Sequence, residues 1–187
     1  NVQFPYFVTH EGGRIAGYED TVLLSVGDFG KGHEAQNISS PLGKIVKVGE
    51  NGSWSVFTLG HRNPQGLFFN PKIGLFISTE HGPSGGDEIN VLSEGANYGW
   101  PLESNGVTDS YDLKPNGSLN GFEIPFWTTK LNPGISQGVY VPRDKCLALS
   151  DTLVIGSLTG QKSGPENFSG HNLLLIPADL SRVEPEK

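Results

Sequence analysis

The chain has 187 residues, of which 35% are hydrophobic and 18% are charged. Its 26 glycines and 13 prolines predict many tight turns rather than long helices, and no apolar run approaches the length of a membrane span. The net charge is −7 and the lysines and arginines are scattered, which argues against a nucleic-acid partner. There is no Met, even at the first position, and no secretory leader, so we expect a processed or internal segment of a longer product.

Short apolar runs, each bounded by Gly, Pro, Asp or Asn, predict the strands. They lie at 22–26, 45–48, 75–78, 153–155 and 173–176. No stretch longer than about a dozen residues keeps the 3.6-residue apolar period of an amphipathic helix, so we expect little helix.

One unit recurs three times, at 10–28, 62–82 and 135–160. It consists of a polar cluster, a Gly, a strand, a turn, an apolar strand and a loop that contains Gly. This recurrence favours the blades of a β-propeller over a β-sandwich, which would give short strands but not the repeated unit. We therefore predict an all-β chain in which residues 1–187 form a single partial β-propeller domain with about three blades.

The repeat has a geometric consequence for its polar residues. Two antiparallel strands joined by a turn return the chain to the end where it entered. The residues that flank each hairpin should then meet on one face of the propeller, around its central channel. The expected groups are His10 with Asp28, Arg62 and Asn63 with Glu80 and His81, and Ser136 with Thr159 and Gln161.

The densest polar motifs are GHRNPQG at 60–66, TEHGPSGGDEIN at 79–90 and GANYGWP at 95–101. HEGGRI at 10–15, VGDFG at 26–30 and AQNISSPLGKI at 35–45 precede them, and GSLTGQK at 156–162 follows. In this order the motifs resemble the glucose/sorbosone dehydrogenase family, over roughly residues 9–162. The resemblance implies a six-bladed propeller that uses pyrroloquinoline quinone (PQQ) with calcium.

The resemblance also implies roles for individual residues. His10 stands where the family has its general base, which takes the proton of a sugar C1 hydroxyl while hydride leaves for the quinone. Arg62 and Asn63 match residues that contact the cofactor, and a guanidinium suits its carboxylates. We expect His10 and Arg62 to be catalytic. Without the resemblance, His10 is better explained as a surface histidine, and Arg62 equally well as a structural arginine.

The His-Gly-Pro turn is the expected calcium and cofactor contact. The resemblance implies that His81, Gly82 and Pro83 bind the cofactor and that the main-chain carbonyls of Gly82 and Pro83 hold its calcium. Glu88 and Tyr98 match a second, structural calcium site, with Asp87 as a weaker neighbour. The alternative is that Asp87 and Glu88 lie in a solvated loop and only cap turns.

Other aromatic residues are expected to pack rather than to react. We predict that His61 is structural and that Trp100 and Trp127 pack between blades rather than stack on sugar. Thr159 departs from the cofactor-binding lysine of the soluble glucose enzymes, and the family's further cofactor arginines would follow residue 187.

The predicted function is that of a quinoprotein that oxidises aldose sugars at C1 and passes electrons to an external acceptor. The alternative is a non-catalytic extracellular propeller that binds or assembles. Either would be periplasmic or extracellular, with the rest of the propeller or a partner chain covering the open edges. The single Cys146 leaves the redox compartment open. The sequons at Asn37, Asn51, Asn116 and Asn167 suit a secreted glycoprotein, although Asn-Gly-Ser at 51 and 116 is better explained as turn chemistry.

Overall fold

Three antiparallel sheets make up the computed structural model, which describes residues 9–158 and 172–178. The first sheet contains β1 (Gly12–Tyr18), β2 (Thr21–Val26), β3 (Lys44–Val48) and β4 (Trp54–Leu59). The second contains β5 (Pro64–Asn70), β6 (Leu75–Glu80), β7 (Asp87–Leu92) and β8 (Trp127–Thr129). The third contains β9 (Ile135–Val141), β10 (Thr152–Ser157) and β11 (Asn172–Pro177). Two short 3₁₀ helices, η1 (Gly32–Gln36) and η2 (Leu147–Leu149), interrupt the loops.

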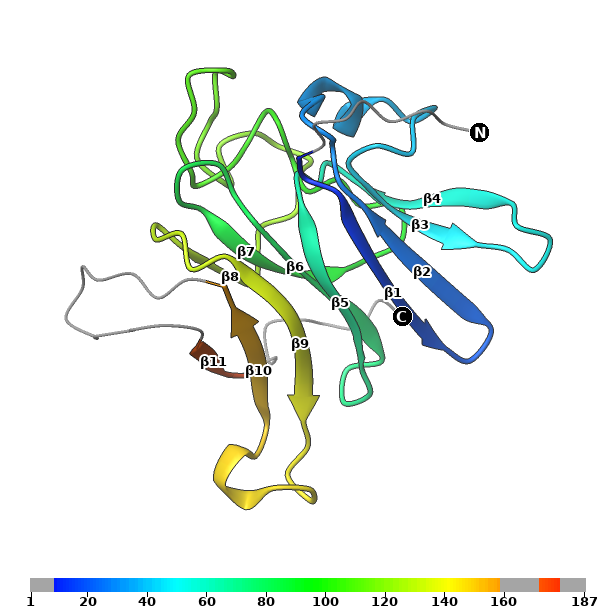
Figure 1. Ribbon diagram of the computed structural model, residues 1–187, viewed down its shortest axis with the longest axis vertical. Helices are drawn as coiled ribbons and strands as arrows, with labels where there is room; N and C mark the ends of the chain where they lie inside the picture. The colour runs from blue at the N-terminus through cyan, green and yellow to red at the C-terminus, as the bar shows by residue number, and fades with distance from the viewer. Residues whose placement is uncertain (1–8, 159–171, 179–187) are drawn as a thin grey trace.

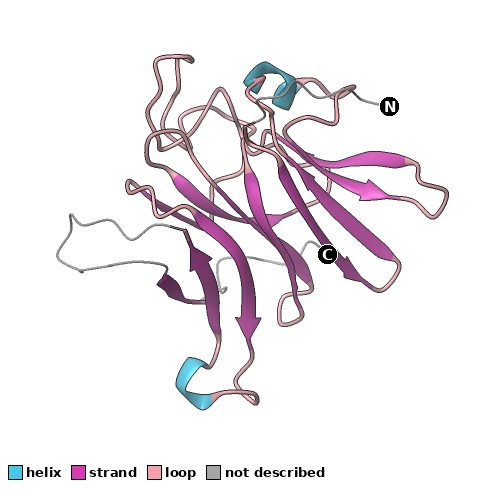
Figure 2. Ribbon diagram, viewed as in Figure 1, coloured by secondary structure: helices cyan, strands magenta, loops and turns pink. Residues whose placement is uncertain are grey.

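The sheets are arranged as neighbouring blades of a propeller. Strands β1, β5 and β9 open their sheets and contact one another in that order, and the later strands of each sheet fan outward (Figure 1). Every paired strand is antiparallel to its neighbour. Figure 2 shows how little of the described chain is helical. The prediction of an all-β propeller segment with about three blades is confirmed.

Burial follows from the position of each sheet. The middle sheet packs on both faces, so β6 and β7 are buried along nearly their whole length. One apolar core lies between the first and second sheets, around Leu23, Leu67 and Leu92. A second lies between the second and third sheets, around Ile77 and Ile155. These cores fix the blades against one another and thereby align their ends.

The five predicted strand segments all lie inside observed strands, at β2, β3, β6, β10 and β11. The structure excludes one alternative for the acidic pair, that it lies in a solvated loop. Asp87 and Glu88 instead begin β7, where both are buried. Two adjacent acidic residues are typical of exposed loops. Here, however, both carboxyl groups accept hydrogen bonds inside the protein instead of facing solvent.

A close approach of backbone joins the ends of β1 and β2. The Gly27 amide donates to the Glu11 carbonyl over 3.2 Å. A Cβ on Gly27 would lie 1.7 Å from the His10 carbonyl oxygen, so only glycine fits there. His10 itself adopts φ of 59°, an uncommon conformation for a residue other than glycine. The chain thus turns sharply at the point where it presents the His10 side chain.

Within the described residues, no helix has both the length and the apolar character that a membrane crossing would need.

Candidate functional site

Polar residues from the three blades meet at one end of the strands. The Asp28 amide donates to the Arg62 carbonyl over 2.8 Å, which joins the first blade to the second. The His81 ring bonds through Nε2 to the Ile135 carbonyl over 2.8 Å, which joins the second blade to the third. The hairpin argument therefore predicts correctly that these residues gather on one face. Ser136 lies at the same end, whereas Thr159 and Gln161 fall outside the described residues.

His10 is oriented by a buried carboxylate. Its Nδ1 lies 2.7 Å from Oδ1 of Asp28, and Asp28 is 1% exposed. Because an ionised carboxylate can only accept, Nδ1 carries the proton and Nε2 is the basic nitrogen of the neutral ring. The His10 side chain is 23% exposed, and Nε2 has no hydrogen-bond partner within 9–158 and 172–178. This is the arrangement of a general base that can receive a proton from a ligand.

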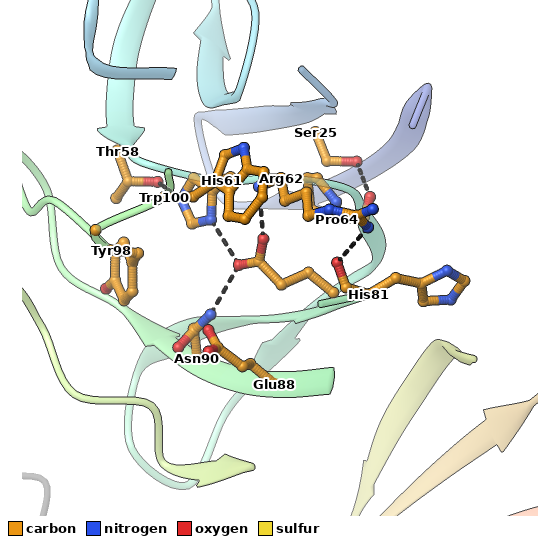
Figure 3. A network of polar contacts seen from close by, with 12 residues as sticks. Ser25, Thr58, His61, Arg62, Pro64, His81, Glu88, Asn90, Tyr98 and Trp100 are labelled. Atoms are coloured by element: carbon orange, nitrogen blue, oxygen red, sulfur yellow. Dashed lines mark hydrogen bonds and ion pairs between the residues drawn. The ribbon is translucent and has the colours of Figure 1, made fainter. Parts of the chain in front are cut away.

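Arg62 adjoins Asp28 through its backbone carbonyl. Its side chain is held on several sides (Figure 3). Its Nη1 donates to the carbonyls of His81 and Gly82 over 3.2 and 2.8 Å, and its guanidinium lies 5.4 Å from the centre of the Trp100 ring. Its Nε is buried and has no acceptor in the described part of the chain. Burial lowers the pKa of Arg62 from its ordinary value, and the negative charges of Asp28 and Glu80 oppose that shift.

A cavity opens next to Arg62. It has a volume of about 430 Å³, and its other walls are Pro83, Ser84 and residues 107–110. The wall is fixed, because Ser84 and Val107 exchange two backbone hydrogen bonds of 3.1 and 3.0 Å. The cavity places a guanidinium, backbone groups, hydroxyls and the Asp109 carboxylate around one space, which suits a polar ligand that accepts hydrogen bonds from Arg62.

Asn63 and His81 lie beside Arg62, but most of their polar atoms have partners inside the protein. Oδ1 of Asn63 accepts from the Gly12 amide over 3.3 Å and from the Gln65 side chain over 2.9 Å. Its Nδ2 lies 3.4 Å from Nδ1 of His81, a long contact. Asn63 therefore joins the second blade to the first, and His81 joins it to the third.

Glu80 is a site residue that the hairpin geometry places with Arg62, but whose role as a shared acceptor the sequence patterns do not indicate. It is 4% exposed and accepts from Nδ1 of His61, from Nδ2 of Asn90 and from the Arg62 amide over 2.8–2.9 Å (Figure 3). His61 is wholly buried, bonds to Thr58 through Nε2 and stacks on Tyr98, so the prediction that it is structural is confirmed. Glu80 therefore fixes the Arg62 backbone by accepting a hydrogen bond from its amide. Its only sequence signal is its place just before His81, at the end of an apolar strand.

The Gly82–Pro83 turn faces Arg62. The Gly82 carbonyl already accepts from Nη1, and one lone pair remains for a cation. Asp87 fixes the turn, since its Oδ1 accepts from the Gly82 amide and its Oδ2 accepts from the amides of Gly134 and Ile135. Burial raises the pKa of Asp87. For Asp87 the turn-capping alternative therefore describes what the structure shows.

Glu88 and Tyr98 line a second, much smaller cavity of about 10 Å³, together with Glu80 and Glu103. Burial, reinforced by the charge of Glu80, raises the pKa of Glu88 to about 8, although Asn116 donates to its Oε1 over 2.7 Å. The Tyr98 hydroxyl donates to the Val91 carbonyl and accepts from the Ser93 amide, so only its main-chain carbonyl is available to a metal. Within the described ranges, no three His, Cys, Asp or Glu side chains form a cluster that could hold a metal by themselves. Any ion there would need carbonyl or water oxygens in addition.

Known proteins resemble this chain over most of its length. The family model described as Glucose / Sorbosone dehydrogenase matches residues 6–164. The chain belongs to the glucose/sorbosone dehydrogenase family. It is 31% identical over 170 residues to the aldose sugar dehydrogenase YliI of Escherichia coli K12, which covers 80% of this chain and 45% of that protein. It is 32% identical over 124 residues to quinoprotein glucose dehydrogenase B of Acinetobacter calcoaceticus, which covers 49% of this chain and 26% of that protein.

Solved structures of the same family share the fold. The apo-form crystal structure of the soluble aldose sugar dehydrogenase from Escherichia coli matches with a TM-score of 0.73 and 28% identity, over 92% of this chain and 56% of that one. The PQQ-bound aldose sugar dehydrogenase from Streptomyces coelicolor matches with a TM-score of 0.66 and 23% identity, over 90% and 49%. The chain thus spans about half the length of YliI and of both solved structures, and about a quarter of quinoprotein glucose dehydrogenase B.

Proposed function

We propose that the intact protein is a quinoprotein dehydrogenase that oxidises aldose sugars at C1 with PQQ and calcium. The observation that carries this proposal is the His10–Asp28 pair, whose basic Nε2 has no partner in the described chain, together with Arg62, whose guanidinium lies over the Trp100 ring that bonds Asp28. The names of the relatives support the same chemistry, since one is an aldose sugar dehydrogenase and one a quinoprotein glucose dehydrogenase.

The residues around Arg62 fit a flat polyanionic cofactor. Arg62 borders a cavity of about 430 Å³, in which its guanidinium would donate to a carboxylate or a quinone oxygen. Arg62, Asn63 and His81 would hold the cofactor, and the carbonyls of Gly82 and Pro83 would hold its calcium. Because Arg62 donates to the Gly82 carbonyl, a bare calcium ion would meet a positive charge there. We therefore expect this calcium to bind weakly without the anionic cofactor.

The chain's own residues would handle the proton. Nε2 of His10 takes the proton of the C1 hydroxyl, and Asp28 stabilises the imidazolium that results. When bound, the quinone supplies the two-electron acceptor for the hydride from C1, so that the sugar becomes a lactone. Arg62 would orient the reacting groups and balance negative charge beside them.

Several features of the whole protein belong to the same proposal. An external electron acceptor would reoxidise the cofactor, and the protein would work in the periplasm or outside the cell. Residues 1–187 would form one part of a single propeller domain, whose other blades or a partner chain cover the open sheet faces.

A non-catalytic propeller that only binds a ligand is the competing function. One observation favours it: the polar atoms of Asn63 and His81 are mostly engaged within the protein. A non-catalytic function, however, does not explain why Asp28 orients His10 as a base.

Replacement of His10 by Gln tests the proposal in the intact, cofactor-loaded protein. Loss of the base should lower kcat for aldose oxidation about 100- to 10,000-fold, while the Kd for PQQ stays within about threefold because His10 is not among the residues expected to hold it. His33→Gln, an exposed histidine in the nearby helix η1, is the matched control and should keep full activity. Equal activity of His10→Gln and the unsubstituted enzyme would contradict the proposal.

A further inference from the structure

We infer that Trp100 is a positioning residue that couples the base in one blade to the cofactor arginine in the next. This inference rests on the proposed function. The sequence predicts only that Trp100 packs, and it is indeed 5% exposed. Packing, however, explains only why the ring is buried. It does not explain why the indole N–H donates a hydrogen bond to Asp28.

The indole N–H fixes the carboxylate that orients His10. Nε1 of Trp100 donates to Oδ2 of Asp28 over 2.8 Å, and both residues are buried. The other oxygen, Oδ1, receives Nδ1 of His10 at 2.7 Å and the Gly30 amide at 2.8 Å. With donors on both oxygens, the carboxylate is held in one rotational state. Hydrogen bonds to ionised acceptors are the stronger class, and burial strengthens them further.

The indole ring fixes the arginine. The Arg62 guanidinium lies 5.4 Å from the Trp100 ring centre, within the range of a cation–π contact. Trp100 therefore contacts the partner of the base through its edge and the cofactor arginine through its face. Asp28, Arg62 and Trp100 come from three different segments of the chain. The rigid side chain of Trp100 therefore sets how far His10 lies from Arg62.

Trp100 is itself held from two sides. Its amide donates to the Gly60 carbonyl over 3.0 Å, and its carbonyl accepts from the Gln36 side chain over 2.6 Å. Tyr111 packs edge-on against the ring at 5.2 Å. A side chain anchored in this way keeps the geometry that its contacts impose.

Trp100→Phe in the intact enzyme keeps an aromatic ring and removes the N–H. We expect kcat for aldose oxidation to fall about 10- to 100-fold, as is typical when the partner of an active-site group is lost, with KM changed less than about threefold. Trp127→Phe, an aromatic residue packed against the second core, is the matched control and should leave kcat unchanged.

Two further readouts separate positioning from packing. In a double-mutant cycle, Trp100→Phe should add little to the loss caused by Asp28→Asn, because both act through the same bond. Nitrogen NMR of the cofactor-free protein should show one His10 tautomer, protonated at Nδ1, and a mixture in Trp100→Phe. This readout stands even if the enzyme proves inactive on sugars. Additive losses, or a single unchanged tautomer in Trp100→Phe, would overturn the inference.

Discussion

At the scale of single residues, the Arg62 guanidinium has some N–H groups with hydrogen-bond acceptors and one without. Nη1 is committed to two carbonyls, while Nε is buried without an acceptor within the described residues. An unmet buried donor costs roughly 1–3 kcal/mol, which a ligand that supplies the acceptor recovers on binding.

Replacement of Arg62 by Lys should therefore weaken cofactor binding, because an ammonium group cannot hold the turn carbonyls and a carboxylate in the same fork geometry. We expect the Kd for PQQ, measured by fluorescence titration at fixed calcium, to rise at least about tenfold. Arg14→Lys is the control, since the side chain of this exposed arginine donates to the Gln65 carbonyl and lines neither cavity described above. Identical affinities in both variants would show that Arg62 is structural.

Lys44 is a second residue with an unusual environment. It is wholly buried, and its Nζ donates to the carbonyls of Glu34, Ala35 and Leu42 over 2.7–2.9 Å. It thereby holds the η1 loop against β3. Burial lowers the pKa of Lys44 from 10.5 to about 8.

This shift predicts a pH dependence of stability. Between pH 8 and 10.5 the unfolded chain binds the proton and the folded chain releases it, so the free energy of unfolding should rise with pH in that window and not below it. Lys44→Met should remove the rise, and at pH 7 it should destabilise the protein by about 2 kcal/mol because three carbonyls lose their donor. Urea unfolding at pH 7 and pH 9.5 measures both effects, with Lys47→Met on the same strand as control. A rise that persists in Lys44→Met would assign it to another group.

At the scale of elements, the start of β7 brings two carboxylates into the interior. Asp87 is accounted for by three backbone amides, whereas Glu88 has Asn116 and lines the small cavity. Without a cation, protonation of Glu88 relieves its proximity to Glu80, since its pKa is raised to about 8, whereas a cation in this cavity would stabilise the ionised form of Glu88.

Calcium at Glu88 is therefore expected to stabilise the fold by mass action. A chelator should lower the melting temperature of the intact protein but leave that of Glu88→Gln unchanged, since the variant no longer binds the ion. Glu94→Gln, on the loop after β7, is the control and should respond like the unsubstituted protein. An unsubstituted protein whose melting temperature ignores the chelator would have no such site.

The sequence predicts some elements much better than others. The second strand of each repeated unit is the easiest to recognise, because β2, β6 and β10 are apolar and supply buried core residues such as Leu23, Ile77 and Ile155. Strand β4 does not stand out, since its first two residues are exposed, and β8 has three residues that are all half-buried. Outer strands gain their structure from neighbours that local composition does not reveal.

The same limit applies to the candidate site. The hairpin geometry predicts that His10, Arg62 and His81 lie on one face, because that follows from strand direction alone. The bond between Trp100 and Asp28 joins residues 72 positions apart, and no spacing rule predicts it. Nor does the sequence show that Asn63 and His81 bond each other and the neighbouring blades.

At the scale of the whole molecule, the three sheets differ in how they are covered. The middle sheet packs on both sides, while apolar side chains such as Val139, Leu173 and Leu175 of the third sheet and Ile15 and Val22 of the first remain exposed. The chain spans about half of YliI and of the solved apo-form structure. We expect further blades or a partner chain to cover these residues in the intact protein.

The central claim is that this fold holds PQQ and reduces it with an aldose. The most direct measurement is a single-turnover experiment without oxygen, in which D-glucose and other aldoses are mixed with the intact protein loaded with PQQ and calcium. We predict that the absorbance of the cofactor changes to that of its reduced form, that one lactone forms per cofactor, and that loaded His10→Gln shows neither. A protein that does not bind PQQ, or a bound cofactor whose spectrum no aldose alters, would contradict the account.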